Sequence, residues 1–412
     1  MTRRLVFLFT GLVLLLGLSG CWNRVEINDL AVITAVAVDR DEEGQVRLSA
    51  QVVLPTALGG AGGMAPGGGP GGGGGGGGGA GSAGGKAFYV VSESGRTLLD
   101  AVRRLQERVP RRLYFAHSRV VLLGERVARE GVTPVLDFFT RFREMRLNSF
   151  VGVVSGEARA LLEVNPPLQR VPSKAISEEQ RMRITVSTMM RDFLNMLLNA
   201  GNGAGPVAPR LEAAPADPLE AGGRREVAVS GAAVFRGDRM VGWLNDYEAQ
   251  GLLWLRGELK NGVVTVKGPH GEPVSLQILR ARTTLRPRIE AGQRLVMGVE
   301  IRVEGEVREV AGAVDLSDPV QLGRIEAAAA EEIEKCVRAT AAKVQQEYGA
   351  DVFGFGEAVR RTLPTAWKEL RTDWPDRFRE VELEPVTEVL IRRTGMTGRP
   401  AGVEEQEEGL MR

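Results

Sequence analysis

The chain of 412 residues carries 53 basic and 52 acidic side chains, so its formal net charge is +1. This near-balance argues against nucleic acid or another polyanionic surface as the main partner. Hydrophobic residues make up 43% and charged residues 25% of the sequence. These fractions are ordinary for a folded protein, and the length predicts two or three domains at about 100–200 residues each.

The N-terminus has the pattern of a lipoprotein signal. Arg3-Arg4 precedes an apolar run from Leu5 to Leu18, and Leu18-Ser19-Gly20-Cys21 follows. The run is shorter than the ~20 residues that a membrane-spanning helix prefers, and the small residues before the cysteine are typical of a cleavage site. We therefore expect removal of a signal peptide at residues 1–20 and lipidation of Cys21, rather than an uncleaved anchor helix. Two acyl chains on Cys21 would anchor the mature chain durably outside the cytoplasm.

The next part of the chain alternates strands with helices. We predict strands at 30–39, 46–54, 87–91, 118–123 and 149–154, and helices at 97–109, 132–145, 157–164 and 177–199. The first two strands should form a hairpin, and the alternation predicts an N-terminal α/β domain over residues 21–200. Residues 59–85 are almost all Gly, Ala and Pro. They favour a flexible loop over a phosphate-binding loop, because no helix start follows them.

A second Gly-, Ala- and Pro-rich stretch at 201–224 predicts a linker. Beyond it we predict strands at 227–235, 240–244, 263–266, 274–285, 294–310 and 381–392, and helices at 247–255, 320–348 and 357–370. These elements suggest a middle β-rich domain at 225–290, a C-terminal α/β domain at 291–398 and a disordered acidic tail at 399–412. The expected fold class is therefore a multi-domain α/β fold (mixed α+β), in which helices pack on mixed sheets.

The tripeptide Arg236-Gly237-Asp238 occurs in cell-adhesion motifs, but it lies between two alternating apolar runs. Gly-Asp in that position is the composition of a hairpin turn. We therefore interpret the tripeptide as a turn.

No catalytic or metal-binding set is recognisable in the sequence. His117 and His270 are the only histidines, and neither has further ligands at the spacing that a zinc site needs. Cys336 lies close to the apolar stripe of a helical pattern and favours a buried core residue over a reactive thiol. Asp351 and Asp373 lie beside aromatic residues, and we interpret them as turn-capping aspartates rather than glycosidase acids. We expect no enzymatic activity and no cofactor.

Three blocks of the sequence resemble the C-subunit lipoproteins of spore germinant receptors, the Ger(x)C (GerAC-like) family. The first block is Cys21-Trp22-Asn23-Arg24-Val25-Glu26-Ile27-Asn28-Asp29-Leu30-Ala31, in which Asn23 replaces the usual Asp. The second block runs from Gly231 to Leu244, and the strongest runs from Gln345 through Gly356 to Phe378. The blocks occur in the family's order and span most of the mature chain.

The resemblance implies a three-domain mixed α/β lipoprotein on the outer face of the inner spore membrane. It implies contacts with two germinant receptor membrane subunits, one multi-spanning and one partly membrane-embedded, and a role in nutrient-triggered spore germination. Cys21 is the only functional residue that it assigns. A block of spaced aromatic residues is interpreted as core rather than an interaction patch: Phe353, Phe355, Trp367, Trp374 and Phe378.

Two other functions stay open at this point. A solute-binding lipoprotein of a transporter would share the anchor and an α/β body, and a deep polar pocket between two lobes would favour it. A lipid-anchored cell-wall enzyme is a third possibility, which the missing catalytic set disfavours.

Overall fold

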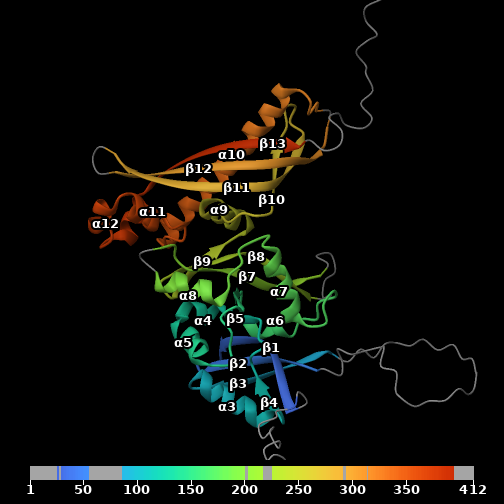
Figure 1. The fold of residues 1–412 in the computed structure, drawn as a ribbon. Coiled ribbons are helices and arrows are strands. Elements are labelled where there is room, and N and C mark those ends of the chain that lie inside the picture. The colour runs from blue at the N-terminus through green and yellow to red at the C-terminus, as the bar shows by residue number, and fades with distance from the viewer. Residues whose placement is uncertain are drawn as a thin grey trace, which may run out of the picture.

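The computed structural model describes residues 26, 29–54, 86–199, 203–216, 225–290, 294–312 and 314–393. Within these ranges the chain forms two β-sheets with helices packed on them (Figure 1), which confirms the mixed α+β class. The first sheet with its helices forms one end of an elongated molecule, and the second sheet with a long helix forms the other end. The predicted signal peptide, glycine-rich loop and acidic tail lie outside the described residues.

The first sheet is mixed, with strand order β3-β2-β1-β5-β6-β7-β8-β9 and a short strand, β4, paired to the start of β1. Its strands are β1 Leu30–Arg40, β2 Val46–Val53, β3 Phe88–Gly95, β4 Arg112–Tyr114, β5 Val120–Gly124, β6 Phe150–Val154, β7 Val207–Pro215, β8 Arg225–Arg236 and β9 Arg239–Leu244. Strands β1, β5, β6 and β7 are parallel neighbours, and antiparallel strands extend the sheet on both sides. The predicted β1–β2 hairpin is confirmed, with Val38 opposite Leu48.

Helices cover both faces of this sheet. They are α3 Leu98–Arg108, α4 Glu125–Glu130, α5 Thr133–Arg141, α6 Ala158–Leu162, α7 Pro172–Met182 and α8 Met190–Leu198. Val36 and Val38 of β1 belong to the core under α3, α5 and α8, whereas Ala35 and Ala37 belong to the core under α6 and α7. Successive strand residues point to opposite faces, so β1 has to be apolar on both. The continuous apolar run of β1 therefore encodes its central position.

The predicted helix over 177–199 is wrong, because the structure has two helices, α7 and α8, in its place. Helix α7 ends at Met182, and the next residue, Arg183, adopts a left-handed φ of 51°. Four of the next five residues, 184–188, are β-branched, and such residues lower helix propensity. Thr188 instead donates its hydroxyl to the backbone oxygen of Val207 in β7 at 3.0 Å. Contact with the sheet thus interrupts the helical pattern.

The second sheet has four strands in the order β10-β11-β12-β13, antiparallel except for the last pair. Its strands are β10 Gly262–Lys267, β11 Pro273–Ile289, β12 Leu295–Val310 and β13 Glu382–Arg393. The helices of this half are α9 Asp246–Arg256, α10 Pro319–Lys343 with the π-helix η2 Val344–Tyr348, α11 Phe355–Thr362, α12 Pro364–Leu370 and α13 Trp374–Glu380. Helix α10 packs against β13 and α9. A Cβ atom at Gly251 of α9 would lie 2.0 Å from Thr340 Oγ1 of α10, so only glycine permits this close approach.

Two further helix predictions need correction. The predicted helix over 357–370 is two helices, because Pro364 begins α12 and α11 ends at Thr362. Proline clashes with a preceding helical turn and donates no backbone hydrogen bond, so it starts a helix better than it continues one. The predicted helix over 320–348 ends in the π-helix η2. The sequence pattern did not predict the short elements β4, α4 and α13.

The structure differs from the predicted linker at 201–224 and the predicted middle domain at 225–290. Strand β7 lies inside the first range and pairs with both β6 and β8. The second range is divided, because β8 and β9 belong to the first sheet while β10 and β11 belong to the second. The ladder between β7 and β8 shifts register between Pro209 and Leu211, and such an irregularity tolerates a proline inside a sheet.

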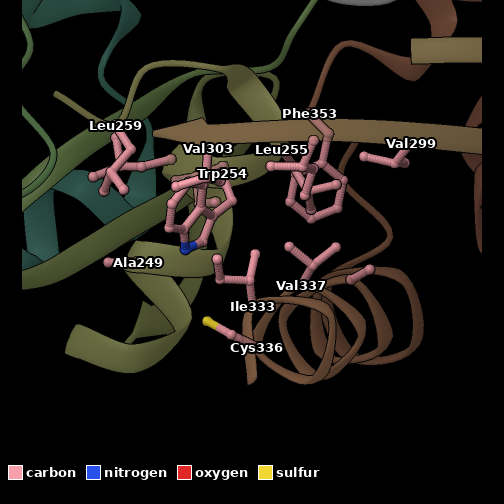
Figure 2. Packing of buried hydrophobic residues seen from close by; sticks show 14 of the residues in the cluster. Ala249, Trp254, Leu255, Leu259, Val299, Val303, Ile333, Cys336, Val337 and Phe353 are labelled. Carbon is pink, nitrogen blue, oxygen red and sulfur yellow. The ribbon is translucent and has the colours of Figure 1, made fainter. Parts of the chain in front are cut away.

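One core joins the two sheets. Val234 and Leu244, from the last strands of the first sheet, belong to the same buried cluster as Trp254 of α9 and Ile333 of α10. Figure 2 shows Trp254 and Leu255 between the strand that carries Val299 and Val303 and the helix that carries Ile333 and Val337. The continuous apolar packing explains why sequence composition alone misplaces the boundary between the two halves.

Candidate functional site

Cys21, the predicted lipidation site, lies outside the described residues, nine positions before β1 begins at Leu30. Leu30 pairs with Arg112 of β4. Strands β5 and β6 are parallel to β1 and therefore begin at the same edge of the sheet. Strand β3 also begins there, and β2 ends there. We call this side of the molecule the strand-start edge, comprising residues 29–32, 86–89, 111–119, 143–150 and 166–171.

The last of these segments joins the edge through packing. Val171, which precedes α7, belongs to a small core cluster with Val53 at the end of β2 and Phe88 at the start of β3. The loop between α6 and α7 therefore lies beside the point where β3 begins. Figure 1 shows β4, which pairs with the start of β1, at the end of the molecule opposite to α10 and β13.

Neither histidine belongs to a metal site or a catalytic set in the described residues. His117 is exposed at the strand-start edge, and its ring meets Tyr114 edge-on with centroids 5.6 Å apart. His270 is exposed in the turn between β10 and β11. Across the described ranges, no three His, Cys, Asp or Glu side chains gather in a group that could hold a metal ion. His117 is therefore a surface residue.

Asp351 caps the start of α11. Its carboxylate accepts backbone hydrogen bonds from Gly354 at 2.9 Å, Phe355 at 3.0 Å and Gly356 at 2.7 Å. Its Oδ2 also accepts a hydrogen bond from the indole nitrogen of Trp374 at 3.1 Å. Burial raises the pKa of Asp351, and these four donors, which stabilise the ionised form, act against that shift. Both oxygens of the carboxylate accept hydrogen bonds that stabilise the fold, which confirms the capping interpretation.

Asp373 lies at the start of α13, where its side chain pairs with Arg377 at 3.0 Å. The block of aromatic residues around these two aspartates is buried, as the sequence predicts: Phe353, Phe355, Trp367, Trp374 and Phe378. Phe353, Phe355 and Phe378 contact one another, and Trp367 meets Trp374 edge-on. These residues form core rather than an exposed patch.

Arg256, at the end of α9, connects the two halves of the molecule. Its side chain is 8% exposed. Its Nε donates to the backbone oxygen of Val352 at 2.7 Å, and its Nη2 donates to the backbone oxygen of Gly205, just before β7, at 2.9 Å. A buried guanidinium that satisfies two backbone oxygens fixes the position of segments far apart in the sequence.

A groove of about 750 Å³ lies between α7 of the first half and α9, β10 and β11 of the second. Glu179 Oε2 lines it and has no hydrogen-bond partner in the described part of the chain. Burial and the nearby charge of Glu226 raise the pKa of Glu179 to about 7. Other polar groups of the groove are bound to the protein: Asp246 accepts from the backbone of Gly231, and Gln250 donates to the backbone oxygen of Val263.

Cys336 is buried, as predicted. It is 2% exposed in α10, and its Sγ donates to the backbone oxygen of Tyr247 in α9 at 3.2 Å. Burial, followed by the neighbouring charge of Glu332, raises the pKa of the Cys336 thiol to about 12. The thiol therefore stays protonated at neutral pH and packs as a small core residue (Figure 2). The Arg236-Gly237-Asp238 tripeptide is likewise the β8–β9 turn, with a φ of 61° at Gly237.

Comparison with known proteins places these features in a family. The family described as "Spore germination protein N-terminal domain" matches residues 23–213, and the family described as "Spore germination B3/ GerAC like, C-terminal" matches residues 230–395. Spore germination protein KC of Bacillus subtilis (strain 168) is 29% identical over 97% of this chain and 98% of its own length. The putative spore germination protein YfkR of the same strain is 30% identical over 92% of this chain and 94% of its own length.

The chain belongs to the Ger(x)C family of spore germination proteins. The fold agrees with this membership. The crystal structure of the GerBC protein aligns with a TM-score of 0.55 at 20% identity, covering 87% of this chain and 97% of that chain. At this identity the alignment shows a shared fold.

Sequence reasoning predicted the capping role of Asp351 but missed Arg256, which also organises this Ger(x)C protein. Asp351 is followed three residues later by Gly354, and an aspartate so placed before a glycine and a helical pattern signals a cap. The role of Arg256 had no local signal, because both of its backbone partners are distant in sequence. Within the described ranges, no helix is long and apolar enough to span a bilayer.

Proposed function

We propose that this protein is the lipid-anchored C subunit of a nutrient germinant receptor and is required for spore germination. It is held through Cys21 on the outer face of the inner spore membrane, where it contacts a multi-spanning and a partly membrane-embedded subunit. The observation that carries the proposal is the match to spore germination protein KC over nearly the full length of both chains. A match that includes both halves supports a common role better than one shared module would.

We further propose that the protein acts by contact and has no catalytic turnover. The polar groups that the sequence offered as candidates have structural partners, since Asp351 caps a helix and Asp373 pairs with Arg377. A lipid on Cys21 would confine the body to the membrane surface and raise its effective concentration near membrane subunits. A small contact area with those subunits would then be enough to keep them associated.

The solute-binding alternative receives less support. Lipoproteins of that class have two lobes wound around parallel sheets, whereas the second sheet here is antiparallel over β10, β11 and β12. The groove beside Glu179 is the feature that a bound solute would use. A nutrient that raises the melting temperature of the purified protein would favour that alternative, and Glu179→Gln should then abolish the shift.

Lipidation is tested by metabolic labelling with a fatty acid analogue. Wild-type protein and Cys336→Ala should be labelled equally, because Cys336 is buried, whereas Cys21→Ala should lose the label and accumulate as uncleaved precursor. Equal labelling of Cys21→Ala and wild type would contradict the anchor. The test separates the two cysteines of the chain, and each variant controls for the other.

The receptor role is tested in spores. Deleting the gene should abolish or slow germination with the nutrients that the receptor recognises, while triggers that bypass receptors remain effective. Tagged wild-type protein should co-purify from spore membranes with a multi-spanning subunit. Normal germination of the deletion strain with every such nutrient, or turnover of a substrate by the purified protein, would refute the proposal.

A further inference from the structure

Positive charge is concentrated at the strand-start edge, although the net charge of the whole chain is only +1. Five basic side chains are exposed there: Lys86, Arg111, Arg119, Arg143 and Arg146. Among the described residues, none of the five has an ion-pair partner. The overall balance of charge in the sequence therefore conceals a local excess of cations.

The acidic groups of this edge do not cancel that excess. Glu144 is engaged, because its Oε1 pairs with Arg112 at 3.3 Å and its Oε2 accepts a hydrogen bond from the backbone of Phe115 at 3.2 Å. Asp29 is exposed just before β1 begins. In the second sheet several charges are paired across strands, such as Arg288 with Glu384 at 2.6 Å.

Large apolar side chains are exposed among these cations. Leu168, in the loop between α6 and α7, is 92% exposed; Leu147, before β6, is 44% exposed; and Tyr89, at the start of β3, is 37% exposed. Arg111 lies close enough to Tyr89 to lower the pKa of its phenol, against the larger effect of burial, which raises it. Cations beside exposed leucine and tyrosine are the composition of a surface that settles into lipid headgroups.

The chain reaches the described fold at this same edge. Cys21 precedes Leu30 by nine residues, and nine extended residues span at most about 32 Å. A lipid on Cys21 would therefore keep the start of β1, which lies at the strand-start edge, within about 32 Å of the bilayer surface. Charges attract a surface strongly only within the Debye length, about 8 Å at physiological salt. The tether would raise the effective concentration of the edge near the bilayer, so that such close approaches become frequent.

We propose that the strand-start edge is a docking surface for anionic phospholipid headgroups. The five cations lie against lipid phosphates, while Leu168, Leu147 and Tyr89 enter the boundary between headgroups and acyl chains. This orientation rests on the proposed anchor at Cys21. Docking would hold the anchored protein in one orientation on the membrane, so that it presents the same side to neighbouring subunits.

The test uses the mature chain, residues 21–412, with Cys21→Ser, so that binding depends on the folded body and not on acylation. Co-sedimentation is measured with vesicles of phosphatidylcholine alone and of phosphatidylcholine mixed with phosphatidylglycerol. We expect binding to the anionic vesicles only, weakening as salt is raised. A basic residue near an anionic membrane contributes about 1 kcal/mol, or roughly a fivefold change in partitioning.

A quadruple Arg→Gln variant at 111, 119, 143 and 146 should therefore lower partitioning by well over tenfold at low salt. The matched control replaces four exposed arginines of the second half that lack ion pairs within the described residues, at 280, 282, 361 and 371, and it should bind like the parent. Leu168→Ser, which changes no charge, should weaken binding severalfold. Unchanged unfolding midpoints establish that all variants are folded.

Several outcomes would overturn the docking surface. One is equal partitioning of the quadruple variant and its control; another is binding to phosphatidylcholine as strong as to the anionic mixture. If the quadruple variant binds vesicles normally but no longer co-purifies with membrane subunits, the edge is a protein interface instead. The vesicle assays use protein that carries no acyl chains on residue 21. If Cys21 labelling fails, the proposed anchor is refuted, but the vesicle results are unaffected.

Discussion

Replacing Asp351 by alanine should strongly destabilise the second half of the molecule. The carboxylate accepts hydrogen bonds from three backbone N–H groups and from the indole of Trp374. All four donors belong to buried residues, and a buried donor left without a partner costs about 1 kcal/mol or more. The expected loss is therefore about 3–4 kcal/mol, a large share of the roughly 5–15 kcal/mol that stabilises a typical domain.

Asp351→Asn should be less damaging, at about 2 kcal/mol, because one side-chain oxygen remains as an acceptor while the amide nitrogen faces two donors. Asp373→Ala is the matched control. Its carboxylate lies in the same aromatic region but pairs with Arg377 near the surface, where an ion pair contributes at most about 1 kcal/mol.

The assay is urea unfolding of the mature chain with Cys21→Ser, followed by tryptophan fluorescence. Three of the five tryptophans, Trp254, Trp367 and Trp374, are buried in the second half, so most of the signal reports on that half. A loss smaller than about 1 kcal/mol for Asp351→Ala, or one equal to that of Asp373→Ala, would refute the view that the carboxylate holds the start of α11.

Three other predictions follow from burial and chain connectivity. Glu179→Gln should stabilise the protein by about 1 kcal/mol above pH 7, a value discounted for partial exposure, and should have no effect below pH 4.5. The raised pKa of Glu179 makes the wild type lose stability as the pH rises from about 4.5 to about 7, and unfolding curves of both proteins across that range measure the difference. Deleting most of residues 59–85 should keep cooperative unfolding and add about 1–2 kcal/mol, at about 0.6 kcal/mol per halving of loop length; loss of cooperativity would show that the tract is structural. Cys336 should resist a thiol reagent in the native state and react only on unfolding, which mass spectrometry can follow.

Local patterns in the sequence determined the elements whose conformation depends on near neighbours. The two apolar runs that become β1 and β2, the glycine turn at Gly237 and the amphipathic helix that buries Cys336 are all confirmed. Family membership could also be inferred from the sequence, because the three matching blocks are contiguous stretches of residues. The lipid anchor at Cys21 stays a prediction.

Partners distant in the chain were decided only by the tertiary structure. Strand β7 has the composition of a linker, and it is a strand because β6 and β8 offer it hydrogen bonds on both sides. The segment after Arg183 leaves the helix because Thr188 reaches β7. In both cases the free energy of long-range pairing exceeds a local preference that amounts to at most about 1 kcal/mol per residue.

The surface that most concerns function also arises only on folding. Lys86, Arg111, Arg119 and Arg146 are scattered over some sixty positions of a chain whose charges balance. Parallel strands begin at a common edge, so folding gathers these residues on one side of the molecule, next to the point where the chain arrives from Cys21. The sequence by itself predicted a lipidation motif at Cys21 and determined many of the helices and strands. Only the pairing of strands decided which charges lie beside the start of β1, because side-by-side placement depends on register and not on composition.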